Sequence, residues 1–178
     1  MERGKEDCHI HMVLDGENWK AAIQRHENGP DRQWIRGILE RYARSGYDYL
    51  RDGGDRWGVG AAARSLAGEY GIRYRTPLAP LYHKGHYGSF IGIGFENVRE
   101  YRELVCKNRE KDFVKIMISG LMDFDRFGVL TQPGLSAGEI RELVHIAHEE
   151  GYAVMAHANG AEVVRAAAEA GVDSVEHG

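Results

Sequence analysis

Four times along the chain, a helix-like segment ends at a glycine, and a short apolar strand follows within one or two residues. The glycines are Gly46, Gly71, Gly151 and Gly171. Glycine readily adopts the left-handed conformation at a helix C-terminus, and strands that alternate with helices are typical of βαβ units. The repeat therefore predicts an α/β fold with a parallel sheet.

Hydrophobic periodicity extends this pattern to six strands and five helices. Helices are expected over 31–45, 60–70, 96–106 and 161–170, and after a capping box formed by Ser136 and Glu139. Strands are expected over 7–11, 47–50, 72–78, 113–118, 152–156 and 172–175. Segments 12–30, 79–94 and 119–135 show neither the helical nor the strand periodicity of apolar residues, so loops are predicted there.

Two parallel architectures fit this order of elements, a doubly wound sheet and a (β/α) barrel. A doubly wound nucleotide-binding sheet carries a glycine-rich phosphate loop after its first strand, and this chain has none there. Polar residues instead lie at or near the carboxyl ends of several strands, as barrel enzymes require. The sequence therefore favours a partial (β/α)8 TIM barrel with about six βα units.

Composition limits the partners and the location of the chain. With 178 residues it is within the size of one domain, and we expect a single domain over 1–178. The formal net charge of −4 gives no reason to expect nucleic acid or an anionic membrane as a partner. No apolar run approaches the roughly 20 residues that span a bilayer, and no signal peptide is recognisable, so a cytoplasmic protein is expected. Two cysteines do not indicate a disulfide framework.

Histidines and one lysine lie at or near the ends of the predicted strands. His9 and His11 are two residues apart on the first strand, so both imidazoles point to the same face. Two imidazoles form only half of a metal site, because a catalytic ion rarely has two protein ligands alone. Lys115 lies within the fourth strand, His157 follows the fifth and His177 the sixth.

This series resembles the amidohydrolase superfamily, in its binuclear branch with a carboxylated lysine. The local sequence around these residues is particularly similar to imidazolonepropionase and Xaa-Pro dipeptidase-like members. The matching segments are Asp7-Cys8-His9-Ile10-His11, Val114-Lys115-Ile116-Met117, Ala156-His157-Ala158-Asn159-Gly160 and Val175-Glu176-His177-Gly178.

The resemblance implies a centre with two divalent metal ions. His9 and His11 would bind the first ion and His157 and His177 the second, while Lys115, carboxylated by carbon dioxide, would bridge them as a catalytic residue. A carbamate offers two anionic oxygens where an ammonium would repel the cations. Zinc is the expected metal, with manganese, iron, cobalt and nickel as chemical alternatives.

The chain departs from that family in length. The family has eight strands, and an aspartate at the end of the eighth binds metal and moves the proton, whereas this sequence stops at Gly178, after the sixth. We therefore expect a fragment of a longer reading frame, truncated after the sixth strand. An open barrel leaves two strand edges unpaired, which favours recruitment of another chain, including a homo-oligomer.

The expected activity is metal-dependent hydrolysis of amide or cyclic amide C–N bonds in a small, dipeptide-like substrate. Two alternatives stay open: a non-catalytic metal-binding fragment, and a lactone or phosphoester hydrolase with the same metals. His83 and His86 lie in a predicted loop and receive no role. Asp52 either caps a turn or supports a metal ligand, and Cys8 is expected to be buried beside Ile10.

Overall fold

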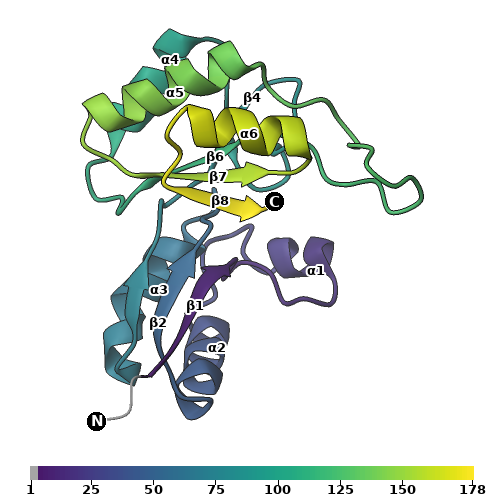
Figure 1. The fold of residues 1–178 in the computed structure, drawn as a ribbon. Coiled ribbons are helices and arrows are strands. Elements are labelled where there is room, and N and C mark those ends of the chain that lie inside the picture. Colours follow the sequence, from purple (N-terminus) through teal and green to yellow (C-terminus); the bar gives the residue numbers. More distant parts are fainter. Residues whose placement is uncertain (1–3) are drawn as a thin grey trace. The chain divides into compact units, whose positions relative to one another are not determined.

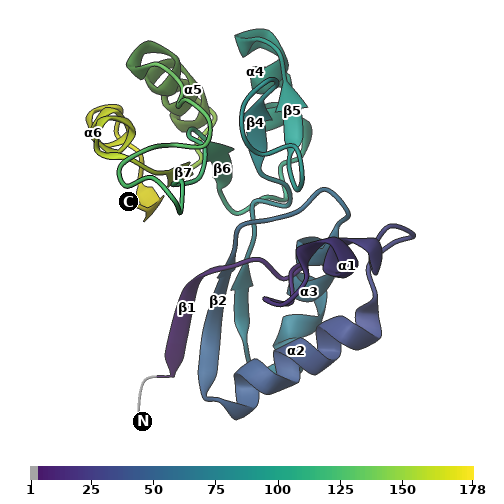
Figure 2. The ribbon, with the colours of Figure 1, turned by 90° about the vertical axis from the view of Figure 1, so that its right-hand side faces the viewer.

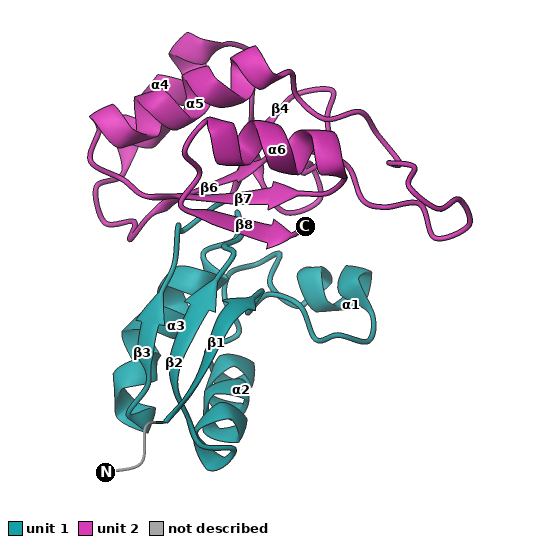
Figure 3. Cartoon of the chain, in the orientation of Figure 1, with its two compact units in different colours: residues 1–79 teal, residues 80–178 magenta. Residues whose placement is uncertain are grey.

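The computed structural model describes residues 4–178 and has an α/β fold with parallel strands. The chain divides into two compact units, residues 1–79 and 80–178 (Figure 3). Each unit has its own sheet and its own helices, and each is described by itself. None of the helices in the described part of the chain is long and apolar enough to cross a membrane.

Unit 1 contains a three-stranded parallel sheet in the order β1-β2-β3. Two longer helices lie on one face of it (Figure 2). The strands are β1 (Lys5–Ile10), β2 (Tyr47–Asp52) and β3 (Arg73–Arg75), and the helices are α1 (Trp19–Gln24), α2 (Arg32–Arg44) and α3 (Val59–Ala67), followed by a 3-10 turn, η1 (Gly68–Tyr70). The side chains of Asn18 and Asp31 cap α1 and α2, which fixes where these helices begin.

Unit 2 contains a five-stranded parallel sheet in the order β5-β4-β6-β7-β8, with its helices on one face (Figure 1). The strands are β4 (Leu81–His83), β5 (Ile93–Phe95), β6 (Val114–Met117), β7 (Val154–Ala158) and β8 (Ser174–His177), and the helices are α4 (Val98–Lys107), α5 (Ala137–Glu149) and α6 (Ala161–Glu169). Every residue of β6 and β7 is buried, which is the pattern of parallel strands covered on both faces.

The parallel α/β prediction is confirmed, and so is the capping box of Ser136 and Glu139 at the start of α5. All four predicted glycines, Gly46, Gly71, Gly151 and Gly171, have a positive φ after a helix. Two predicted loops were wrong in part. Segment 12–30 contains α1, and segment 79–94 contains β4 and the start of β5. These elements have six and three residues, which is too short for periodicity to reveal them.

Candidate functional site

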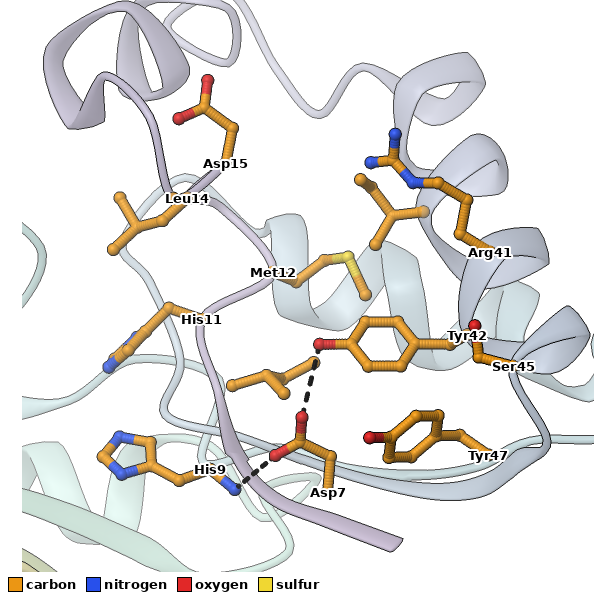
Figure 4. Close-up of a pocket in the computed structure, with 13 residues that line it drawn as sticks. Asp7, His9, His11, Met12, Leu14, Asp15, Arg41, Tyr42, Ser45 and Tyr47 are labelled. Carbon is orange, nitrogen blue, oxygen red and sulfur yellow. Dashed lines mark hydrogen bonds between the residues drawn. The ribbon is translucent and has the colours of Figure 1, made fainter. Parts of the chain in front are cut away.

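In unit 1 the two predicted metal-binding histidines lie side by side at the end of β1. The ring centroids of His9 and His11 are 5.3 Å apart, and both rings project to the same side of the chain (Figure 4). The pairing of β1 with β2 is irregular between Asp7 and Ile10. Asp7 consequently faces helix α2, where it accepts a hydrogen bond from the hydroxyl of Tyr42 at 3.5 Å, instead of lying beside the imidazoles.

The same irregularity accounts for Cys8, whose predicted burial was wrong. Strict alternation would place Cys8 on the face of Ile10, and Ile10 is 8% exposed. Cys8 is exposed, because the alternation does not hold across the irregular part of the strand.

The imidazole of His11 rests on a glycine turn that follows β2. Its Nδ1 lies 3.3 Å from the carbonyl oxygen of Gly54, and a carbonyl can only accept. The contact therefore selects the Nδ1–H tautomer, which places the ring's lone pair on Nε2. A Cβ at Gly53 would overlap Cε1 of His11 and lie 2.7 Å from Nε2, so only glycine allows the ring this position.

Beneath this turn lie two buried carboxyl groups, Asp52 and Asp55, which are 1% and 2% exposed. Burial, followed by the neighbouring charge of Asp55, raises the pKa of Asp52 to about 7. Burial also raises the pKa of Asp55, against the hydrogen bonds that it accepts from backbone N–H groups at the start of α3. The sequence left Asp52 as either a turn cap or a support for a metal ligand and gave Asp55 no role, although the two flank a double glycine at a strand end.

A groove of about 570 Å³ adjoins the histidine pair in unit 1. It is lined by Asp7, His9, Ile10, His11, Met12, Leu14, Asp15, Gly16, Ile38, Arg41, Tyr42, Ser45 and Tyr47 (Figure 4). The residues from α2 are spaced as one helical face. Burial and the nearby Asp7 carboxylate raise the pKa of Tyr42 to about 12, so this hydroxyl stays protonated as a donor.

In unit 2 the predicted site residues come from three neighbouring strands. Met117 on β6 pairs with His157 on β7. Lys115 precedes Met117 by two residues and therefore shares a sheet face with His157. Lys115 and His157 are 1% and 3% exposed, so the alternative that Lys115 only extends to solvent at the sheet end does not hold.

The third residue, His177, reaches His157 through an unusual backbone conformation. His177 pairs with Ala158, and strand alternation would turn its ring away from that of His157. Its φ is +79°, in the left-handed region, and the two ring centroids lie only 4.7 Å apart. A non-glycine residue held there costs on the order of 1–3 kcal/mol, and such residues cluster at functional sites.

Polar groups that follow β6 and β7 contact the imidazole of His157. Its Nε2 lies 3.3 Å from the carbonyl oxygen of Gly120 and 3.1 Å from Nδ2 of Asn159. Nδ2 of Asn159 also donates to the Gly120 carbonyl, and the Asn159 backbone N–H donates to Ser119 Oγ. The two contacts of Nε2 require opposite tautomers, because the Gly120 carbonyl can only accept from Nε2–H, whereas Nδ2 of Asn159 can only donate to a lone pair on Nε2.

An aromatic side chain covers one face of the same ring. Tyr87, from the loop between β4 and β5, stacks on His157 with centroids 4.9 Å apart and planes 29° apart. Burial raises the pKa of the Tyr87 hydroxyl. The sequence analysis missed Tyr87 and Asn159. Asn159 could have been noticed because it follows His157 by two residues on a predicted strand end, whereas no local signal identifies Tyr87.

The other two histidines in this region have backbone partners. Nε2 of His83 lies 3.1 Å from the carbonyl oxygen of Glu96, and Nδ1 of His86 lies 3.4 Å from that of Pro133. Their rings contact each other at 5.3 Å between centroids. Across residues 4–178, no group of three or more histidine, cysteine, aspartate or glutamate side chains is placed to hold a metal ion. The described candidates are thus a histidine pair in each unit, with Lys115 in the second.

Comparison with solved structures identifies the fold. An ochratoxinase of A. niger matches with a TM-score of 0.75 and 22% identity, over 98% of this chain and 46% of its own. A Xaa-Pro dipeptidase with bound methionine in the active site matches at 0.72 and 21%, over 98% and 48%. A prolidase complexed with N-methylphosphonate-L-proline matches at 0.71 and 24%, over 98% and 47%.

The fold is a partial (β/α)8 barrel. These neighbours include amidohydrolases, and the present chain spans under half the length of each of the three. Sequence comparison adds nothing to this likeness, since no protein-family model and no curated protein matches the chain. At identities below a quarter, the likeness concerns the fold, and function has to be argued from the residues themselves.

Proposed function

We propose that the chain is the metal-binding part of a hydrolase that cleaves amide or cyclic amide C–N bonds in small, dipeptide-like substrates. The observation that carries this proposal is that Lys115 and His157 share a sheet face and that the rings of His157 and His177 lie 4.7 Å apart, in a fold shared with prolidases. Barrel enzymes place their chemistry at the carboxyl ends of such strands.

The donor set fits divalent metal ions. Imidazole nitrogens suit zinc, and ligating histidines usually donate their other ring N–H to a carbonyl or carboxylate. His11 shows this arrangement with Gly54, and the Nε2–H tautomer of His157 would have it with Gly120. In this proposal unit 1 holds an ion through His9 and His11, and unit 2 holds an ion through His157 and His177.

Lys115 supplies the anionic ligand of the proposal. Its amine would add to carbon dioxide, forming an N–C bond and releasing a proton, so that a carbamate replaces a cation that would repel metals. A bound ion lowers the pKa of water and polarises a substrate carbonyl. The residues of the chain contribute orientation: the Gly53–Gly54 turn holds one imidazole, while Asn159 and Tyr87 hold another.

The test compares Lys115→Ala with Lys84→Ala, a lysine of the same unit that forms an exposed ion pair with Glu96. The wild-type chain is expected to bind two Zn²⁺ ions, to show a carbamate signal by ¹³C NMR under labelled bicarbonate, and to hydrolyse Xaa-Pro dipeptides. Lys115→Ala is expected to lose the signal and to bind fewer ions, whereas Lys84→Ala keeps both.

The outcomes separate this proposal from its alternatives. Metal content that stays the same in Lys115→Ala would remove Lys115 from the centre. Two bound ions without any turnover of amides would favour the alternative of a non-catalytic metal-binding fragment. Turnover of lactones or phosphoesters in place of amides would keep the metals and change the bond.

A further inference from the structure

Asp52 connects three segments of unit 1 that are distant in sequence. It is the last residue of β2, and its Oδ1 accepts a hydrogen bond from the backbone N–H of Met12 at 3.2 Å. Its Oδ2 accepts from the hydroxyl of Thr76, which follows β3, also at 3.2 Å. A Cβ at Gly60 would overlap Oδ2, so helix α3 packs directly on this carboxyl group.

Both segments that define the position of His11 adjoin these contacts. Met12 is the residue after His11, and the Gly53–Gly54 turn that receives the His11 ring comes directly after Asp52. The turn is itself tied to β1, because Gly53 donates its N–H to the carbonyl of Ile10 at 2.7 Å. One buried carboxyl group therefore fixes the peptide that carries the imidazole and the turn on which it rests.

We propose that Asp52 is the positioning residue of His11, which sets the tautomer and direction of the imidazole through the Met12 peptide and the glycine turn. The consequence for metal binding rests on the proposed function, whereas the effect on the imidazole does not. Groups that orient a metal ligand through hydrogen bonds typically change metal affinity 10–100-fold when they are removed.

Asp55 provides a matched control within the same turn. It is equally buried, but its oxygens accept from the N–H groups of Trp57, Val59 and Gly60, which start helix α3. Its removal should destabilise the helix start without moving His11. Asparagine is a close mimic of Asp52, since it keeps the acceptor for Met12, and the raised pKa of Asp52 means that much of this carboxyl is already uncharged near neutrality.

The experiment uses the full chain with four variants: Asp52→Ala, Asp52→Asn, Asp55→Ala and Thr76→Val. Long-range ¹H–¹⁵N spectra report the tautomer of His11, and competition with a chromophoric chelator reports the affinity for Zn²⁺. Asp52→Ala is expected to lose the Nδ1–H tautomer of His11 and to bind Zn²⁺ at least about tenfold more weakly. Asp52→Asn and Asp55→Ala are expected to resemble the wild type in both measurements.

An unchanged His11 tautomer in folded Asp52→Ala would overturn the inference, and so would an equal change in Asp55→Ala. If Asp52→Ala does not fold, Thr76→Val decides, because it leaves the carboxyl group in place and removes the hydroxyl after β3 that donates to it. That variant is expected to shift the His11 spectrum partially, and no shift would overturn the inference.

The two proposals fail in different ways. A wild-type chain that binds no Zn²⁺, but whose His11 tautomer depends on Asp52, would contradict the proposed function alone. A chain that binds two ions with a His11 tautomer indifferent to Asp52 would contradict this inference alone.

Discussion

The two units hold their histidine pairs by different means. In unit 1, His9 and His11 belong to one strand, and a glycine turn receives the second ring. In unit 2, His157 and His177 come from two strands, and they meet because the second adopts a left-handed backbone conformation. The first pair depends on a local pattern and a close approach. The second depends on strand register and on strain, and the following predictions test this difference.

The largest expected effect concerns the buried carboxyl groups beside the unit 1 pair. The pKa of Asp52 rises from 3.8 to about 7 on folding, mainly through burial. Between these values the folded state binds more protons than the unfolded state, so the free energy of unfolding falls as the pH rises. At about 1.4 kcal/mol per pK unit, the loss across this window is on the order of 4 kcal/mol. Asp52→Asn should remove this pH-dependent loss in the free energy of unfolding, as measured by urea unfolding at several pH values.

The difference in the free energy of unfolding between Asp52→Asn and the wild type isolates the contribution of Asp52 from that of other titrating groups. Burial lowers the pKa of His26, against the attraction of Asp55, so His26 destabilises the folded state on acidification and has the opposite sign. That contribution largely cancels in the difference. In unit 2, Arg126 lowers the pKa of Asp123, so Asp123→Asn should instead lose stability relative to wild type as the pH rises. The same sign for both variants would contradict the assignment.

A smaller effect is expected where the glycine turn meets His11. Gly53→Ala places a methyl group against the imidazole, and overpacking of this kind typically costs 1–3 kcal/mol. The ring should leave its contact with Gly54, with a loss of the Nδ1–H tautomer in the same NMR spectra. Gly37→Ala is the control, since its Cβ would meet nothing and alanine favours the interior of α2. A Gly53→Ala chain with an unmoved His11 ring would show that the turn does not position it.

Features set by a local sequence pattern could be predicted from the sequence, whereas features set by strand pairing could not. Glycines after helices predicted the parallel α/β fold, and alternation along one strand predicted that His9 and His11 lie together. Their metal binding, and that of the unit 2 residues, stays a prediction. The sequence could not predict the irregularity in β1 that exposes Cys8, because strand pairing determines it. Nor could it show that Asp52 reaches Met12, 40 residues away.

The smallest effect tests the strain at His177. An L-residue in the left-handed region is disfavoured by roughly 1–2 kcal/mol, and glycine escapes most of this cost. His177→Gly should therefore be more stable than His177→Ala by about 1 kcal/mol in thermal or urea unfolding. Ser174, on the same strand, gives the control, because there the alanine variant should be the more stable of the two. If the alanine variant is the more stable one at position 177 as well as at position 174, His177 is not held in a strained conformation.

The approach of His157 and His177 would then carry no cost in backbone strain, and the contrast with unit 1 would reduce to strand register alone.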